Sequence, residues 1–297
     1  MDGRTLLMHQ VMLSDGERLR AYDLALRESI NPGDVVADLG AGMLALSFLA
    51  LRHGAGHVFA VEGDPDTAAM AARIAESNGL ADRLTVVRGD ARKVRLPVPA
   101  DVVVGELMGN LGPEEEMPET FAEFAADNLA EGGRVVPGRL TTDLTAIQFD
   151  GEGWGVWSED FLGYDLRAVQ EHAAPGPQLH FFQRDPLPLS RSVPAVTADL
   201  GAKAPSASGE VHELPITRPG TLHAVMGSFT AAFTPGVSLS NFPSYPGCNW
   251  AVWIWPLRHT AVAPGDVLGV RLHRPESVRD VAEWRLDCGI VRRKERT

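Results

Sequence analysis

Short apolar runs and segments with helical periodicity alternate along the first half of the chain. Apolar runs of this length are typical of buried strands, and the longer stretches between them favour helices. One helix start is marked by Asp64 in the N-cap position and Pro65 in the first turn. Strands are predicted at residues 35–39, 57–62, 84–87, 101–104 and 134–136, and helices at 43–52, 64–77 and 121–129. This order predicts an α/β fold, with a parallel sheet of Rossmann-like type covered by helices.

The pattern changes after Pro137, where Pro and Gly become frequent and short alternating segments replace the helical ones. Residues 140–149, 222–233, 250–255 and 267–272 predict strands of an antiparallel, barrel-like β domain. The intervening stretch 173–208 is rich in Pro, Ala and Ser and is predicted to be a loop or an extended arm. We therefore divide the chain into a Rossmann-like domain, residues 1–137, and a β domain for substrate binding and dimerisation, residues 138–297.

Composition narrows the class of protein. The chain has 297 residues, of which 44% are hydrophobic and 22% charged, as in soluble globular proteins. Its formal net charge of -12 disfavours binding to nucleic acid, which requires basic patches. Cys248 and Cys288 have no CxxC spacing, and the histidines are scattered, so no metal site is expected. The start of the chain lacks the pattern of a signal peptide, and no apolar run could span a bilayer, so we expect a cytoplasmic protein without membrane contact.

A candidate cofactor loop follows the first predicted strand. Asp38-Leu39-Gly40-Ala41-Gly42 lies between a strand and a helix, where glycines allow a sharp turn and a close approach of a ligand to the backbone. Glu62 ends the next strand and could accept hydrogen bonds from both ribose hydroxyls of an adenosine. Asp90, after the third strand, offers a polar contact for the adenine. The alternative is that these are ordinary strand-end turns. NAD is the rival cofactor, but the rest of the chain supplies no dehydrogenase signature.

Two further motifs give the chain a family resemblance. One is the segment from His9 to Arg18, with Met12, Leu13 and Asp15 in between; the other is Gly105-Glu106-Leu107-Met108-Gly109, with a second glutamate, Glu115, nine positions after Glu106. With the cofactor loop, these motifs make the chain resemble the protein arginine methyltransferases. The resemblance is dense over residues 9–140 and thinner in the β half, where 229–233 and 249–250 still align.

The resemblance implies S-adenosylmethionine as the cofactor. Met12 would line its sulfonium, and Arg18 would bind its carboxylate. The full set of implied cofactor-binding residues is Met12, Arg18, Asp38, Gly40, Gly42, Glu62, Asp90 and Ala91, and the implied substrate residues are Met108, Asn249 and Trp250. The family forms head-to-tail dimers through an arm, so a homodimer is expected here, with residues 167–211 as the candidate arm.

Glu106 and Glu115 are the candidate catalytic residues. Two carboxylates can hold a guanidinium in a fork, fix its plane and draw positive charge away from the attacking nitrogen. Paired acids also raise each other's pKa. The competing interpretation is that Glu106 merely ends a strand and that Glu115 is an acid favoured at a helix N-terminus. The chain is thus predicted to methylate a guanidino group, either of an arginine in a protein or of a small arginine-like molecule.

Four departures from the family pattern keep alternatives open. Leu44 stands at the third glycine of the cofactor loop, so a slightly reshaped loop is expected. Arg92 stands where a glutamate often meets the adenine amino group, and Asn249 replaces a histidine. The aromatic helix that precedes the His9 segment in the family is absent, which favours a small acceptor or an exposed peptide. The alternatives are an enzyme of the same fold that methylates an amine or hydroxyl of a small metabolite, and an inactive cofactor-binding subunit of an active partner.

Overall fold

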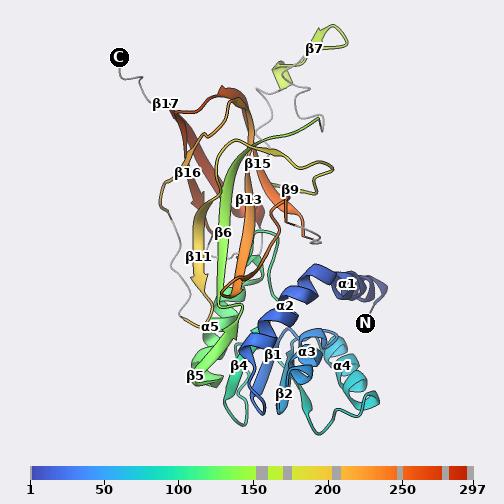
Figure 1. Ribbon diagram of the computed structural model, residues 1–297. Coiled ribbons are helices and arrows are strands. Elements are labelled where there is room, and N and C mark those ends of the chain that lie inside the picture. Colours follow the sequence, from blue (N-terminus) through green and yellow to red (C-terminus); the bar gives the residue numbers. More distant parts are fainter. Residues whose placement is uncertain are drawn as a thin grey trace.

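The described chain forms an α/β half and a β half that are stacked end to end (Figure 1). The structure is a computed structural model. It describes residues 2–151, 160–169, 176–202, 209–245, 250–275 and 281–292.

The α/β half is built on a five-stranded parallel sheet with the order β3-β2-β1-β4-β5. Its strands are β1 (Val35–Leu39), β2 (His57–Glu62), β3 (Leu84–Arg88), β4 (Ala100–Gly105) and β5 (Leu129–Val136). The helices are α1 (Gly3–Ser14), α2 (Gly16–Ser29), α3 (Ala45–Arg52), α4 (Pro65–Ser77) and α5 (Met117–Asn128). The order of the strands along the chain reverses between β1 and β4, which is where open α/β sheets bind ligands. The Rossmann-like prediction is confirmed.

The β half is antiparallel, as predicted. In its main sheet, β6 (Arg139–Gln148) pairs with β13 (Gly220–Thr234), and β13 pairs with β15 (Val252–Val262). The second sheet consists of β12 (His212–Pro215), β16 (Asp266–His273) and β17 (Arg285–Arg292). The shorter strands are β7 (Asp160–Phe161), β8 (Tyr164–Asp165), β9 (Gln178–His180), β10 (Leu187–Pro188), β11 (Val193–Asp199) and β14 (Val237–Ser240).

The loop prediction for residues 173–208 is wrong for part of the described stretch and holds for residues such as 181–186, which form no strand. β9, β10 and β11 lie in this stretch, and each pairs with a strand of the main sheet. The proline content suggested a loop, but β11 pairs only with β6, and an edge strand tolerates proline. The pairing shifts register between Pro194 and Val196, so an irregularity in the strand accommodates the ring.

The two halves share a hydrophobic core. Phe229, Ala231 and Phe233 of β13 belong to the same buried cluster as the strands of the parallel sheet. Tyr22 of α2 packs its ring edge-on against Phe233, with 4.7 Å between the ring centroids. This shared core fixes how the halves meet, and any site between them therefore has firm walls on both sides.

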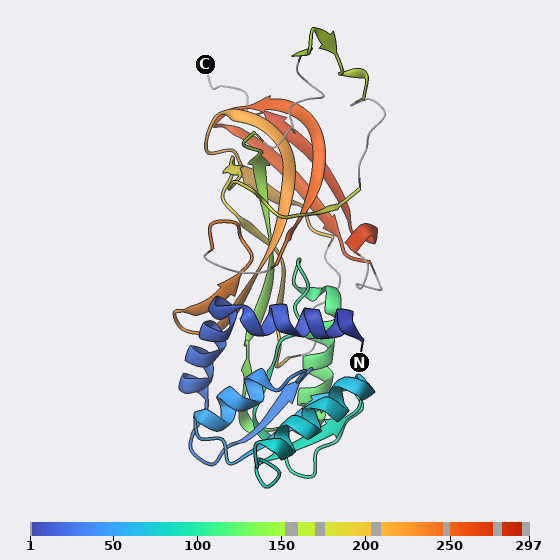
Figure 2. The ribbon, with the colours of Figure 1, turned by 90° about the vertical axis from the view of Figure 1, so that its right-hand side faces the viewer.

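Helix α1 lies across the end of the α/β half that faces the β half (Figure 2). The segment ahead of His9 is thus helical, although it has no aromatic residue. α1 begins after Asp2, whose side chain caps it, and several of its apolar side chains are exposed. Within the described ranges, no helix has the length and apolar character needed to cross a membrane.

The junction of β1 and β4 yields a stability prediction. Tyr22 donates a 2.9 Å hydrogen bond to the Gly105 carbonyl, and a Cβ on Gly105 would lie 2.6 Å from the carbonyl oxygen of Leu39. Because that neighbour is backbone, Gly105→Ala should lower the free energy of unfolding by about 3 kcal/mol, on the scale of overpacking a core. Urea unfolding measures the loss. Gly16→Ala is the control, since nothing lies within 4 Å of its Cβ position; equal losses for both variants would contradict the steric argument.

Candidate active site

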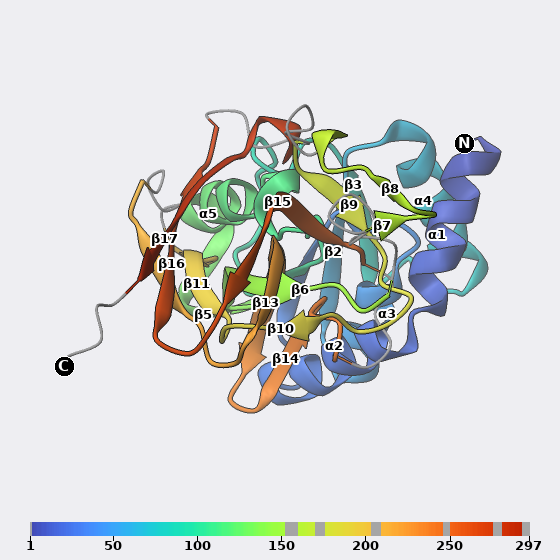
Figure 3. The same cartoon turned by 90° about the horizontal axis from the view of Figure 1, so that it is seen from above.

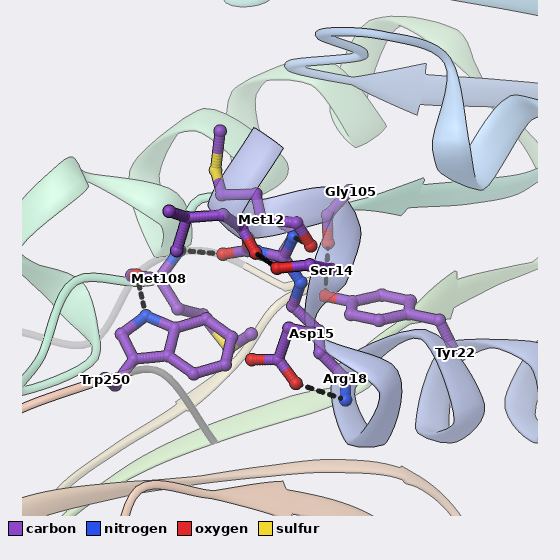
Figure 4. Close-up of polar contacts among 10 residues, drawn as sticks. Met12, Ser14, Asp15, Arg18, Tyr22, Gly105, Met108 and Trp250 are labelled. Carbon is purple, nitrogen blue, oxygen red and sulfur yellow. Dashed lines mark hydrogen bonds and ion pairs between the residues drawn. The ribbon is translucent and has the colours of Figure 1, made fainter. Parts of the chain in front are cut away.

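The turn between α1 and α2 positions a buried arginine. Asp15 ends α1 and caps α2, accepting a 3.1 Å hydrogen bond from the backbone N–H of Arg18. This break in the helical path turns the chain, so that Arg18, in the first turn of α2, points into the interface between the halves (Figure 4). Sequence reasoning identified Arg18 but overlooked Asp15 as the residue that holds it.

Arg18 contacts both halves of the molecule. Its guanidinium donates to Glu106 Oε2 at 2.7 Å and to the backbone carbonyl of Met12. Its Cζ lies 5.5 Å from the centroid of the Trp250 ring, within range of a cation–π contact. A carboxylate and an aromatic face therefore already surround one guanidinium in this site.

The loop from Glu106 to Glu116 carries both candidate catalytic glutamates. Gly109 and Gly112 each donate a backbone hydrogen bond to the carbonyl of the other, both 3.1 Å long, which closes a tight turn. The 3-10 helix η1 (Pro113–Glu115) then leads Glu115 back towards Glu106.

Polar contacts from the β half hold this loop. The indole N–H of Trp250 donates to the Met108 carbonyl at 3.1 Å, and the amide of Asn241 donates to the Asn110 carbonyl at 2.6 Å. Thr142 of β6 donates to the next carbonyl, that of Leu111, at 3.0 Å. The loop is thus fixed on the β half while its first glutamate follows β4 of the parallel sheet.

Glu106 and Glu115 line the same cavity, as the family resemblance implied. The cavity has a volume of about 170 Å³ and is lined by Val11, Met12, Asp15, Arg18, Glu106, Met108, Glu115 and Trp250. Both described residues of the predicted substrate set, Met108 and Trp250, are among them. Asn249 lies outside the described residues.

Burial changes the acidity of both glutamates. Burial raises the pKa of Glu106 above its ordinary value, and the negative charge of Glu115 adds to this, while Arg18 opposes it. Glu115 is exposed at the mouth of the cavity, yet enough protein surrounds its carboxyl group for burial to raise its pKa as well. Glu115 also directly precedes Glu116, the N-cap of α5, so its position agrees with the competing interpretation of a helix N-terminal acid as well.

A second cleft adjoins this cavity at the carboxyl end of β1, and Met12, Arg18 and Glu106 line both. Its walls include Asp38, Gly40 and Gly42, all predicted to bind the cofactor, together with His9 and Tyr22, which sequence reasoning did not assign. Asp38 is buried, and Ser47 donates to its Oδ2 at 2.7 Å, but its Oδ1 has no hydrogen-bond partner in the structure. Burial raises the pKa of Asp38 to about 6. Such an orphaned acceptor fits a ligand with a donor group.

The glycine loop keeps the backbone that such a cleft needs. Gly40 has φ +69°, and a Cβ there would lie 2.6 Å from Leu107 Cδ2. Leu44, at the position of the family's third glycine, also adopts a left-handed conformation, with φ 69°. The turn is therefore kept despite the leucine, at a cost in backbone strain of about 1 kcal/mol.

The residues predicted to bind the ribose and adenine do not line the cofactor cleft. Glu62 accepts backbone hydrogen bonds from Gly42 at 2.9 Å and Asp64 at 2.8 Å, and thereby ties the end of β2 to the glycine loop. The residues that line the cleft do not include Glu62, Asp90 or Ala91. Arg92 turns to Glu116, forming a 2.6 Å ion pair between the loop after β3 and the start of α5.

Comparison with known proteins agrees with this geometry. The sequence model of the family described as PRMT5 arginine-N-methyltransferase matches residues 35–135. Protein arginine N-methyltransferase 1 of Chlamydomonas reinhardtii is 28% identical over 271 residues, which is 87% of this chain and 77% of that protein. The chain is a protein arginine methyltransferase-like, S-adenosylmethionine-dependent methyltransferase.

Solved structures show the same fold for this methyltransferase. The Trypanosoma brucei PRMT1 enzyme-prozyme heterotetrameric complex with AdoHcy matches with a TM-score of 0.81 at 20% identity, covering 97% of this chain and 94% of that one. Arabidopsis thaliana protein arginine methyltransferase 10, in an open conformation, matches with a TM-score of 0.80 at 20% identity, covering 97% and 93%.

The cleft fits the amino-acid end of S-adenosylmethionine. The unpartnered carboxyl oxygen of Asp38 suits its ammonium group, the guanidinium of Arg18 suits its carboxylate, and Gly40 and Gly42 line the cleft. Glu62, which accepts a hydrogen bond from the backbone of the glycine loop at Gly42, would also bind the ribose. These roles remain predictions for the individual residues.

Glu62→Ala tests the ribose end of the cofactor site. The variant loses an acceptor for the ligand and the tie to Gly42, so its affinity for S-adenosylmethionine should fall at least about tenfold, as expected when a charged hydrogen-bonding group is lost. Isothermal titration calorimetry measures the affinity, whose loss should exceed the loss of folding stability measured by thermal unfolding. Glu76→Ala, at an exposed position on α4, is the matched control. Unchanged affinity in folded Glu62→Ala would remove Glu62 from the site.

Proposed function

We propose that this methyltransferase transfers the methyl group to a guanidino nitrogen of an arginine side chain or of a small arginine-like molecule. One observation carries the proposal: the cavity beside the cofactor cleft holds the guanidinium of Arg18 between Glu106 and the ring of Trp250. The groups that bind this internal guanidinium are those that an incoming one would need.

The chemistry places a specific demand on the two glutamates. When bound, S-adenosylmethionine supplies a methyl group on a sulfonium, which an acceptor nitrogen displaces in line. Glu106 and Glu115 would orient the guanidinium and draw its positive charge away from the attacking nitrogen. Because their pKa values are raised, either carboxylate could also take the proton that the nitrogen releases. The walls formed by Met12, Met108 and Trp250 would limit access of water.

The paired carboxylates favour a guanidine over an amine or a hydroxyl. A guanidinium presents N–H donors in a planar fork, which two carboxylates can bind from two sides, whereas an ammonium is a compact point charge. The names of the relatives, which specify arginine in proteins, support the same acceptor class.

Charge-neutral variants test the roles of the glutamates. Glu106→Gln and Glu115→Gln should each lower kcat about 100-fold or more, on the scale of removing one preorganised charge-stabilising group. Affinity for S-adenosylmethionine should change much less in Glu115→Gln, because Glu115 does not line the cofactor cleft. The double variant should lose much less than the product of the single losses, because the pair acts as a unit. Radiolabelled methyl transfer to arginine and arginine peptides measures these rates.

The matched control is Glu123→Gln, which neutralises an exposed carboxylate on α5 and should leave turnover unchanged. If Glu106→Gln and Glu115→Gln both retain full rates on a guanidino acceptor, these two carboxylates do not bind the acceptor. If the wild type methylates only amines or hydroxyls of small metabolites, the acceptor assignment fails.

We further propose that the methyltransferase is a homodimer, with the β7–β8 hairpin as its arm. This hairpin projects from the far end of the β half (Figures 1 and 2), and in the view from above it lies on the side of α1 (Figure 3). Its residues Leu162 and Tyr164 are 82% and 73% exposed. The arm predicted at 167–211 is wrong, because β9, β10 and β11 of that range lie in the main sheet. So short a hairpin gains stability when it packs on another surface.

Light scattering tests this assembly. The wild type should have a dimeric mass at micromolar concentration, and Leu162→Glu should shift the mass towards the monomer, because it puts a charge in a buried contact. Val98→Glu, at another exposed apolar position, should leave the dimer intact. A monomeric wild type would refute the proposal.

A further inference from the structure

We propose that Glu114 is a positioning residue that acts in its neutral form and fixes the second arm of the catalytic loop, so that Glu115 faces Glu106. The inference deepens the proposed function, since Glu115 is one of its two acceptor-binding carboxylates. Glu114 itself does not line the acceptor cavity. It would act through the backbone that carries Glu115.

Glu114 connects the loop to the β half. It is only 7% exposed, and its Oε1 accepts hydrogen bonds from the Leu111 backbone N–H at 2.5 Å and from the indole N–H of Trp253 at 3.1 Å. Leu111 belongs to the same loop, and Trp253 belongs to β15, three positions after the Trp250 that holds Met108. Two tryptophans of one segment therefore hold the two arms of the loop, and Glu114 is the contact on the second arm.

The side chain of Glu114 also fills the inside of the loop. A Cβ on Gly109 would lie 2.6 Å from both Cδ and Oε2 of Glu114, so the carboxyl group packs directly against the Gly109–Gly112 turn. Its Oε2 is buried and has no hydrogen-bond partner in the part of the chain that the structure describes. The position thus requires a side chain of this length, but both hydrogen bonds reach Oε1, and within the described residues no cation or donor contacts Oε2 to stabilise a negative charge.

The surroundings favour the protonated carboxyl group. Burial raises the pKa of Glu114 to about 7, and the adjacent negative charge of Glu115 adds to this; the backbone N–H groups of Glu114 itself and of Leu111, and the indole N–H of Trp253, oppose it. Among the groups that shift the pKa of Glu114, Glu115 is the one with a titratable side chain. The contact from β15 comes from the indole of Trp253, which does not titrate. Above this pKa, a charge would be placed in an unpaired site immediately beside the acceptor-binding glutamate.

The sign of the resulting pH dependence follows from linkage. A carboxyl group whose pKa is raised by folding destabilises the folded state once the pH exceeds its unfolded value, and the loss grows until the folded pKa is passed. The contribution of Glu114 should therefore lower the melting temperature as the pH rises from about 5 to about 7. Turnover should fall on the alkaline side, by about tenfold per unit above the pKa if only the neutral form is competent.

Glu114→Gln provides the test, because glutamine has the same size, retains an acceptor for Leu111 and Trp253, and cannot ionise. We expect the variant to keep wild-type turnover near pH 6, to lose the alkaline decline in kcat, and to lose part of the fall in melting temperature. Methyl transfer to an arginine peptide at saturating S-adenosylmethionine and thermal unfolding, each followed across this pH range, supply the two readouts. Glu123→Gln is the control and should behave as the wild type does.

Two outcomes would overturn the inference. One is a Glu114→Gln variant whose pH profiles of kcat and melting temperature superimpose on those of the wild type. The other is a variant with an unchanged melting temperature but kcat near pH 6 reduced by more than about tenfold, because the neutral form would then not be competent. If the wild type methylates no arginine acceptor, the proposed function fails, while the melting temperatures still decide the role of Glu114.

Discussion

The site depends on keeping acidic side chains close together on one loop. Glu106, Glu114 and Glu115 lie on one short loop, and burial raises the pKa of all three. Like charges in a poorly solvated place repel, so the loop would open without compensation. The ion pair between Arg18 and Glu106 supplies one cation, and hydrogen bonds from the β half hold the backbone in place.

Both halves of the molecule are needed to hold the acidic loop in place. The parallel sheet supplies the cofactor cleft and Glu106 at the end of β4, while the β half supplies the tryptophans and Asn241 that shape the loop. Neither half could build the acceptor cavity alone. The core that joins α2 to β13 through Tyr22 and Phe233 keeps these contributions in register.

Much of this could be predicted from local sequence. The strand and glycine-loop signals around Asp38 and Gly40 depend on contacts between near neighbours. The placing of Glu106 and Glu115 at one cavity came from the family resemblance, whose two-glutamate spacing they match. The role of Glu114 could not be predicted, because it depends on Trp253, which is 139 positions away. In the sequence, Glu114 is one of three consecutive glutamates, and nothing local distinguishes the buried one. The strand β11 was not predicted because it contains Pro194. A proline is tolerated in a strand at the edge of a sheet, and that edge position is known only from the fold.

The central claim is that the cavity beside the cofactor cleft selects a guanidino group. The most direct measurement locates the transferred methyl group: an arginine peptide and free arginine are incubated with the protein and S-adenosylmethionine, and the products are analysed by tandem mass spectrometry. The account predicts that the added methyl group lies on a guanidino nitrogen in at least one of the two products. Methylation confined to the α-amino group, to a lysine placed in the same peptide, or to a hydroxyl would contradict it.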